Sequence, residues 1–354
     1  MMATSLANQT AKAEDIVRLE SILLRFQIVF LLFTIFAALV GNLLVLVATF
    51  LDRRLHNANK YFVASLAVSD LLVAMFSVTV RLHLYLNLNQ PLTLAFCRFW
   101  IWVDIFGEAA SITTLTMISI DRYYKVSKPF RYKANMTTHR AYRIIVLIWI
   151  YSAVIAALSL IPYAGNKGVH IISNKCQNEN RTFYTFAALL GFFIPVAILI
   201  ILCTLIFRIV QIHSRKRLPS QECNDDSARI HQCRQTHSNR RSLLTLTIIV
   251  LTFIICWGPF FVLFVIFQYK PALQGAMGQY GFMILHNICF GVLPYCNSFL
   301  NPIIYAFFDK TFNAAIKNML LRITTGSKKY SMCPSSTVRV TRHRPKAGVL
   351  LTTL

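Results

Sequence analysis

Charged residues are scarce in this chain, and acidic residues are the scarcest. Only 14% of the 354 residues are charged, with 13 Asp and Glu against 36 Lys and Arg, while 56% are hydrophobic. A soluble domain needs a polar exterior, so this composition indicates a protein solvated by lipid. The net charge of +23 would suggest nucleic acid binding in a soluble protein. Here the basic residues fall between apolar stretches, so no nucleic acid partner is expected.

Other features are missing as well. The chain has no internal repeats and no paired interrupted spans, which a transporter would be expected to show. No metal cluster or nucleophile–base set stands out, so we expect no enzyme activity. The first apolar run is too long for the core of a signal peptide, so no cleavable leader is expected.

Seven stretches are long and apolar enough to cross a membrane as helices, which takes about 20 residues each. They are residues 26–50, 61–85, 95–124, 141–163, 183–210, 242–267 and 280–307. The sequence therefore predicts an all-α membrane protein, a seven-transmembrane helix bundle over residues 26–307. Residues 1–25 form a short extracellular tail, and residues 308–354 form a short amphipathic eighth helix followed by a cytoplasmic tail.

Most Lys and Arg residues fall on one side of these spans, which orients the N-terminus outside and the C-terminus inside a plasma membrane. Cys97 and Cys176 are the two cysteines on the outer side, where disulfides persist, so we predict that they pair. Asn8 and Asn180 begin glycosylation sequons on that side. The inner loop at 211–241 is polar and basic, and we expect it to be partly disordered.

Several spans carry polar residues, which are costly in hydrocarbon and are functional candidates. Their motifs, read in order, resemble the rhodopsin-like (class A) G protein-coupled receptors. The motifs are Gly41-Asn42, Leu66-Ala67-Val68-Ser69-Asp70, Asp121-Arg122-Tyr123, Trp149, Cys256-Trp257-Gly258-Pro259 and Asn301-Pro302-Ile303-Ile304-Tyr305. The match covers all seven spans in order, which makes the set specific although each motif alone is weak.

The resemblance implies roles for the matching positions. Arg122 would pair with Asp121 in the inactive state and engage a G protein in the active one. Phe130 would present an apolar plug to the G protein. The positions implied in switching and coupling are Ile112, Asp121, Arg122, Tyr123, Phe130, Pro195, Phe253, Asn301, Pro302 and Tyr305.

The resemblance also implies a sodium pocket, because five oxygen-bearing residues match it and an all-oxygen site with one carboxylate suits a hard cation. They are Asp70, Ser111, Asn297, Ser298 and Asn301. No other cofactor is expected. A retinal photoreceptor is disfavoured, since no lysine occurs between Pro271 and Asp309.

Two positions depart from the family pattern. Cys203 stands where members usually have a tyrosine that supports the active state, and Asn239 stands where many have an acid that locks Arg122. These departures predict a weak inactive lock and leave room for basal activity.

The ligand site is expected around Asp104, seventeen residues before Asp121 and therefore close to five turns further out on the same helix. In amine receptors the matching aspartate pairs with the ligand ammonium, and aromatic faces around a carboxylate favour a cation. The alternative is that Asp104 pairs internally with Arg81. The predicted ligand-binding residues are Trp100, Asp104, Glu108, Trp257, Phe260, Phe261 and Tyr295.

Glu108 is the unusual member, because amine receptors generally have no acid there and it shares a helix face with Asp104. Three explanations stay open. The ligand carries two positive centres, Glu108 is protonated, or Glu108 bonds a polar group of another helix. The second and third are favoured, since buried lone acids often neutralise.

The span at 183–210 departs as well, with Ala187, Ala188 and Gly191 where catecholamine receptors place serines. A catechol would leave its hydroxyls unpaired there, so catecholamines are disfavoured. The sequence thus predicts a receptor that binds a small cationic, amine-like ligand and activates a heterotrimeric G protein. A peptide or lipid receptor is the alternative within the same fold. Arrestin, membrane lipid and, through Thr352-Thr353-Leu354, a PDZ protein are further expected partners.

Overall fold

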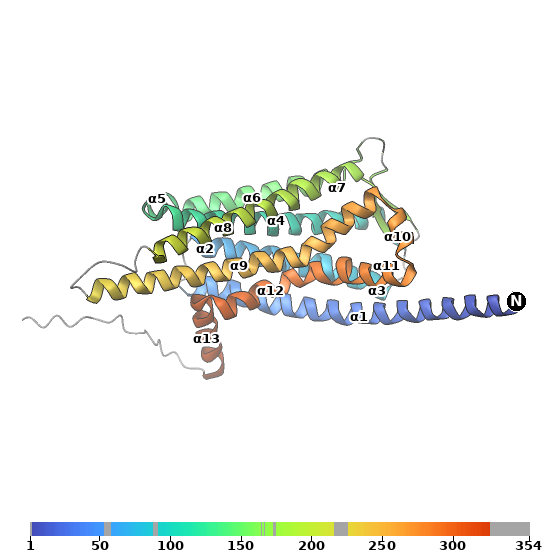
Figure 1. Cartoon of the computed structure of the whole chain (residues 1–354), viewed down its shortest axis with the longest axis horizontal. Coiled ribbons are helices and arrows are strands. Elements are labelled where there is room, and N and C mark those ends of the chain that lie inside the picture. Colours follow the sequence, from blue (N-terminus) through green and yellow to red (C-terminus); the bar gives the residue numbers. More distant parts are fainter. Residues whose placement is uncertain are drawn as a thin grey trace, which may run out of the picture.

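The seven predicted spans are all present as helices, which confirms the fold class. The computed structural model describes residues 2–52, 58–87, 91–163, 165, 167–172, 175–215 and 226–325. Within these residues, seven helices are long and apolar enough to cross a membrane. They lie side by side along one axis (Figure 1). Their membrane-crossing parts are Ala11–Leu51, Lys60–Leu86, Leu94–Ser127, Thr138–Leu158, Arg181–Ile209, Leu244–Tyr269 and Gln279–Phe308.

The bundle is built with its polar side chains inside. Large apolar side chains such as Phe36 and Ile255 are exposed on its outer surface, whereas Asn42 and Asp70 are buried. This distribution suits lipid as the solvent, because an apolar exterior costs nothing there and polar groups must find partners within the bundle.

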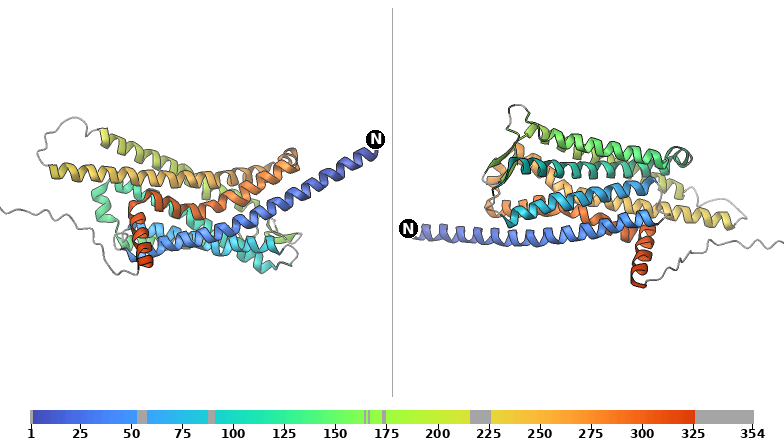
Figure 2. Two further views of the ribbon diagram at one scale, coloured as in Figure 1. Left: turned by 90° about the horizontal axis from the view of Figure 1, so that it is seen from below. Right: turned by 180° about the vertical axis from the view of Figure 1, so that it is seen from behind.

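The first helix, α1 (Met2–Leu51), extends well beyond the predicted span. Residues 2–40 contain neither glycine nor proline, so nothing interrupts the helix before the membrane. The N-terminal part projects past the end of the bundle (Figure 2). Tyr280 donates a hydrogen bond from its hydroxyl to the carbonyl of Lys12 at 3.3 Å. Residues 2–25 of the predicted tail are therefore helical.

Three of the spans contain a stretch of π-helix. These are η2 (Val73–Val78) between α2 (Ala58–Leu72) and α3 (Thr79–Leu86), η3 (Leu189–Phe193) between α7 (Arg181–Ala188) and α8 (Ile194–Arg215), and η4 (Asn287–Val292) between α11 (Gln279–His286) and α12 (Leu293–Phe308). A π-stretch adds a residue to the turn and shifts the face that the following helix presents, and it is frequent at functional sites.

The outer end of the bundle carries a β-hairpin. Strands β1 (Val169–Ile172) and β2 (Lys175–Asn178) pair antiparallel, with Val169 opposite Asn178. Cys176 on β2 forms the predicted disulfide with Cys97 in α4 (Leu94–Ser127), which ties the hairpin to the top of the bundle. A short helix, α10 (Ala272–Ala276), lies at the same end (Figure 1).

Two shorter helices, α5 (Pro129–Asn135) and α13 (Lys310–Thr325), lie at the opposite end of the bundle. After α4, α5 precedes α6 (Thr138–Leu158). The last helix, α13, turns away from α12 and runs across the bundle axis (Figure 1). Helix α13 spans the residues of the predicted amphipathic helix, and its Phe312 and Ala315 side chains are buried. The prediction of an amphipathic helix is therefore confirmed.

Three further boundaries differ from the sequence-based ones. Helix α6 ends at Leu158 rather than near residue 163, because Pro162 cannot continue a helix. Helix α9 (Asp226–Tyr269) begins well inside the segment at 211–241, and α8 continues to Arg215. The loop expected to be partly disordered is thus helical over most of its described length.

Candidate ligand-binding site and signalling core

A cavity of about 610 Å³ opens toward the hairpin end of the bundle. Its wall comes from α3, α4, α6, β2, α7, η3, α8, α9, η4 and α12. All seven predicted ligand-binding residues line it: Trp100, Asp104, Glu108, Trp257, Phe260, Phe261 and Tyr295. A concave, mostly apolar site with several aromatic side chains and few polar groups is what a small-molecule pocket requires.

Asp104 is held in place by the neighbouring helix. Its Oδ1 accepts a hydrogen bond from the Ser77 hydroxyl, which η2 supplies. The two helices are close at this level because α4 has Gly107 against Val73, where an added Cβ would lie 2.6 Å from a Val73 methyl carbon. Ser77 was missed by the sequence reasoning, since its contact depends on the π-stretch. Asp104 therefore presents a fixed carboxylate with one oxygen still available to a ligand.

Arg81 enters the same cavity without a direct bond to Asp104. Its guanidinium carbon lies 5.2 Å from the Tyr295 ring centroid and 5.9 Å from that of Trp100. It donates to the carbonyl of Phe290 at 3.4 Å. Within the described part of the chain, no ion pair within 4.0 Å joins Arg81 to Asp104. The alternative, an internal pair of Asp104 with Arg81, is therefore not formed in this structure, because ring faces and a backbone carbonyl hold the guanidinium instead.

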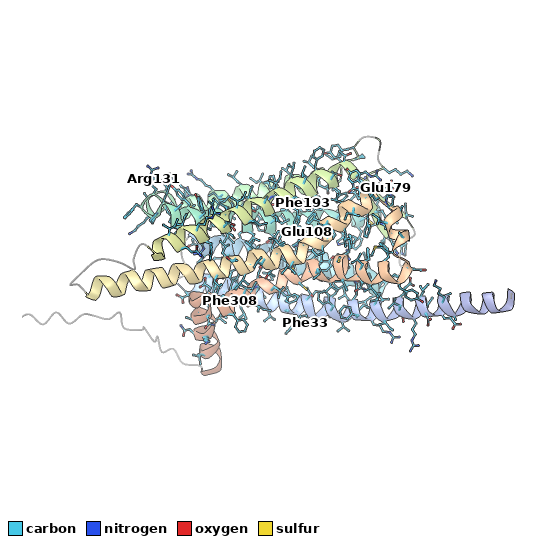
Figure 3. All side chains as sticks on the ribbon, in the orientation of Figure 1. Phe33, Glu108, Arg131, Glu179, Phe193 and Phe308 are labelled. Atoms are coloured by element: carbon cyan, nitrogen blue, oxygen red, sulfur yellow. A yellow bond between two sulfur atoms is a disulfide. The ribbon has the colours of Figure 1, made fainter. Side chains whose placement is uncertain are left out.

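Glu108 lies one turn deeper than Asp104 and faces the cavity. Figure 3 labels it inside the bundle. Among the described residues, no side chain or backbone group forms a hydrogen bond or ion pair with its carboxylate. The idea that it bonds a polar group of another helix is thus contradicted, since the facing wall is largely apolar and aromatic.

The floor and one side of the cavity are aromatic. Trp257 lies 5.6 Å from Phe260 and 5.8 Å from Phe261 between ring centroids. Phe260 continues the cluster to Phe290 at 5.1 Å. Phe290 and Tyr184 also line the cavity and were missed, because aromatic residues recur throughout the spans without a pattern that marks these two.

Three positions on the wall formed by α7 and η3 carry no hydrogen-bonding side chain. Ala187 and Gly191 line the cavity, and Ala188 is buried beside it. Hydroxyl-bearing residues line the cavity elsewhere, at Tyr184 of α7 and, on other helices, at Thr113 and Tyr151. A ligand hydroxyl directed at α7 and η3 would find no side-chain partner at these three positions.

Below the cavity, the predicted sodium residues are buried together with Asn42. Asn301 donates to Asp70 Oδ2 at 2.9 Å, which joins α12 to α2. Asn42 donates to the carbonyl of Ser298 at 2.9 Å, which joins α1 to α12. Ser111, Asn297, Ser298, Asn301 and Asp70 are all at most 5% exposed. The donor set is oxygen-rich with a single carboxylate, and this chemistry fits a monovalent hard cation.

The predicted switch residues pack in the core beneath the ligand cavity. Ile112, Phe253 and Trp257 belong to one buried cluster, and Pro195 lines the cavity above it. Phe192 bridges them, 5.8 Å from Phe253 and 4.4 Å from Phe261 between ring centroids. The cluster thus connects the aromatic floor of the cavity to the inner half of the bundle. Tyr305 is buried and stacks on Phe312 at 5.6 Å.

At the inner end, Asp121 accepts a hydrogen bond from Tyr132 of α5 at 2.9 Å. Burial and the Asp121 carboxylate raise the pKa of the Tyr132 phenol, which keeps it a donor. Among the residues that the structure describes, no ion pair joins Arg122 to Asp121, so the expected pairing is not formed in this structure. The Tyr132 hydroxyl bonds the Asp121 carboxylate instead. Tyr123 is half-buried in the core cluster, whereas Phe130 is 91% exposed on α5.

Asn180 does not suit a glycan. Its Oδ1 accepts from the backbone N–H of Phe183 at 3.3 Å as the N-cap of α7, and its Nδ2 donates to the carbonyl of Ile161 at 2.7 Å. The side chain is fully buried, so a sugar on Nδ2 has no space. The predicted modification there is wrong, because the residue serves as a cap. The side chains of Asn8 and Asn239 and the segment Thr352–Leu354 lie outside the described residues.

A seven-helix membrane bundle with a ligand cavity above a packed switch core defines a membrane receptor. The family model described as "7 transmembrane receptor (rhodopsin family)" matches residues 41–305, and the chain belongs to that family.

Relatives in the same family include the D(1B) dopamine receptor of Xenopus laevis, 35% identical over 314 residues, which span 81% of this chain and 68% of the relative. The D(1B) dopamine receptor of Homo sapiens is 32% identical over 350 residues, or 85% and 70% of the two chains. The octopamine receptor beta-2R of Drosophila melanogaster is 29% identical over 341 residues, or 86% and 62%.

Proposed function

We propose that this receptor binds a small cationic amine at Asp104 and activates a heterotrimeric G protein. One observation carries the proposal: the Asp104 carboxylate opens into an aromatic cavity of about 610 Å³ with the size and chemistry of an ammonium site. The dopamine and octopamine receptors among its relatives support an amine. The bare wall at Ala187 and Gly191 favours an amine without catechol hydroxyls.

Binding would act by population shift, because a ligand favours whichever state it binds more tightly. The ligand would lie on Trp257, whose cluster reaches Phe253 and Ile112 in the inner half of the bundle. Repacking there would open the inner end, where the exposed Phe130 offers an apolar contact to the G protein.

The test is Asp104→Asn, which keeps the size of the side chain and removes its charge. Amine-evoked G protein signalling should fall by at least about 100-fold in potency, since an ammonium loses its counter-ion. Glu20→Gln, the same change of charge at an exposed position of α1, is the matched control. Unchanged amine potency at equal surface expression would rule out the amine proposal.

The bundle is proposed to sit in the plasma membrane with the hairpin end outside. The disulfide at that end supports this orientation, and so do the basic Arg131 and Lys133 of α5 at the other end, where Figure 3 labels Arg131. Arrestin and lipid contacts on the inner side, and a PDZ protein at the C-terminus, remain part of the proposal.

A sodium ion is proposed as an allosteric ligand of the buried set around Asp70. Asn301 already bonds one Asp70 oxygen, and the remaining oxygens come from Ser111, Asn297 and Ser298. Agonist affinity compared in sodium chloride and in N-methylglucamine chloride tests it. Equal affinities in both salts would argue against the ion.

A further inference from the structure

Glu108 is the group in the ligand cavity that the proposed amine site does not explain. It is a second acid on the same face of α4, and within the described residues nothing bonds its carboxylate. Asp104, by contrast, already accepts from Ser77. A half-buried carboxylate without a partner inside the bundle is costly, so a ligand that supplies a partner gains binding energy at this place.

The charges of the cavity wall indicate how many cations it takes. Three ionisable charged side chains line it: Asp104, Glu108 and Arg81. With both acids ionised the wall carries one net negative charge, because Arg81 offsets one of them. A ligand with a single positive charge makes the site neutral, whereas a dication would leave an excess positive charge in a low-dielectric cavity.

The spacing of the two acids allows one cation to serve both. Residues four apart on a helix have Cβ atoms about 5–6 Å from each other on one face. An ammonium nitrogen placed between two such carboxylates lies within hydrogen-bond reach of each, about 2.8 Å. This arrangement needs at least two N–H donors on the same nitrogen, one for each acid.

We propose that Asp104 and Glu108 share one ligand ammonium, so that the receptor selects primary and secondary amines over their tertiary and quaternary N-methylated forms. This inference rests on the proposed amine site and specifies its ligand. A primary ammonium donates to both acids and keeps one donor for another acceptor. A tertiary ammonium has one donor and leaves one carboxylate unpaired, while a quaternary ammonium leaves both without a hydrogen bond.

The experiment compares four cations in which methyl groups replace N–H donors one at a time: phenethylamine and its N-methyl, N,N-dimethyl and N,N,N-trimethyl derivatives. Each is tested for G protein activation and for thermal stabilisation of the purified full-length receptor. In the wild-type protein, potency should fall along the series, by roughly tenfold or more between the primary and the tertiary amine.

Glu108→Gln is the decisive variant, because glutamine has the size of the acid and mimics its neutral form. This variant should lower the potency of phenethylamine by tenfold or more. The potencies of the four cations should then differ by no more than about threefold. Glu108→Asp keeps a carboxylate and should retain part of the preference. Thr116→Val is the control, because Thr116 lies on the same helix outside the cavity lining and its hydroxyl donates to the carbonyl of Ile112; this variant should keep the order of the series. Surface staining and the melting temperature of each variant identify a folding defect, in which case the Glu108→Asp series decides.

Four results would overturn the inference. An unchanged order in Glu108→Gln would mean that Glu108 is neutral and uninvolved. A stronger response to putrescine or cadaverine than to phenethylamine, lost in Glu108→Gln, would mean two separate cation subsites. No response of the wild-type receptor to the series would contradict the amine site itself. An amine response that falls in Asp104→Asn but is unchanged in Glu108→Gln would contradict the sharing of one ammonium by the two acids. It would not contradict the proposed function.

Discussion

Gly41 shows how one missing side chain sets the distance between two helices. An added Cβ at Gly41 would lie 2.8 Å from the Cβ of Pro302, so α1 and α12 touch through a glycine and a proline ring. The adjacent Asn42 then reaches the carbonyl of Ser298. The close approach therefore positions the polar contact that joins the two helices next to the proposed ion site.

We expect Gly41→Ala to destabilise the receptor by about 1–3 kcal/mol, because the rigid proline ring cannot yield and the helices must separate. The measurement is thermal unfolding of the detergent-solubilised protein. Gly281→Ala is the matched control, since its added Cβ meets nothing within 4 Å and it also lies in a helix. That control should be neutral or stabilising by up to about 1 kcal/mol. Equal melting temperatures for the two variants would refute the role of the contact.

At the scale of residues, the sequence located the cavity better than the bonds inside it. Helical spacing and the family motifs placed Asp104, Trp257 and Tyr295 on the cavity wall, where the structure has them. The Ser77 bond could not be foreseen, because it depends on the π-stretch of η2 and on Gly107 against Val73. A sequon likewise carries no information about burial, which is why Asn180 was misjudged.

The last helix is fixed to the bundle by a small group of contacts at its N-terminus. Asp309 accepts a hydrogen bond from the Phe312 N–H at 3.3 Å, and its other oxygen pairs with Lys60 at the start of the second span. The Lys60 ammonium also lies 4.1 Å from the Phe312 ring centroid. Burial by itself would raise the pKa of Asp309, but the Lys60 charge and these hydrogen bonds outweigh burial and lower it.

Asp309→Asn keeps the helix cap and removes the charge, so we expect it to cost roughly 1–3 kcal/mol and to loosen α13. Amide exchange of residues 310–321 measures the loosening, with Lys60→Gln and the double variant completing a cycle. Because the folded-state pKa of Asp309 is lowered, this stability is complete above the usual value of 3.8 and is lost only as pH falls through the lowered pKa. A loss of α13 protection between neutral pH and pH ~5 would contradict this account.

Among the elements, those that a membrane requires were predictable and those that pack outside it were not. About 20 apolar residues and the 3.6-residue repeat sufficed for the spans and for α13. The β1–β2 hairpin was not predicted, because its strands are four residues each and their pairing depends on contacts with the bundle. The N-terminal part of α1 and the start of α9 are polar helices, and polarity alone was interpreted as loop or tail.

Over the whole molecule, one covalent link joins the outer hairpin to the bundle. Cys97 and Cys176 are 79 residues apart in sequence, and Cys176 lines the ligand cavity while Cys97 is buried in α4. The link therefore holds one wall of the cavity against the helix that carries Asp104 and Glu108. Topology predicted the pair, since these were the two cysteines expected on the outer side.

Cys97→Ser and Cys176→Ser should each weaken amine binding by tenfold or more and lower the melting temperature, because a loop of this length gains about 4 kcal/mol from closure. The double variant should match the single ones, since all three lack the same bond. Cys289→Ser, which replaces a free cysteine in η4, is the control and should change neither quantity by as much. Ligand affinity and thermal unfolding are measured on the purified protein with and without reductant. If the two substitutions were additive, the cysteines would act separately, and the hairpin would hold its place over Asp104 through packing rather than through the disulfide.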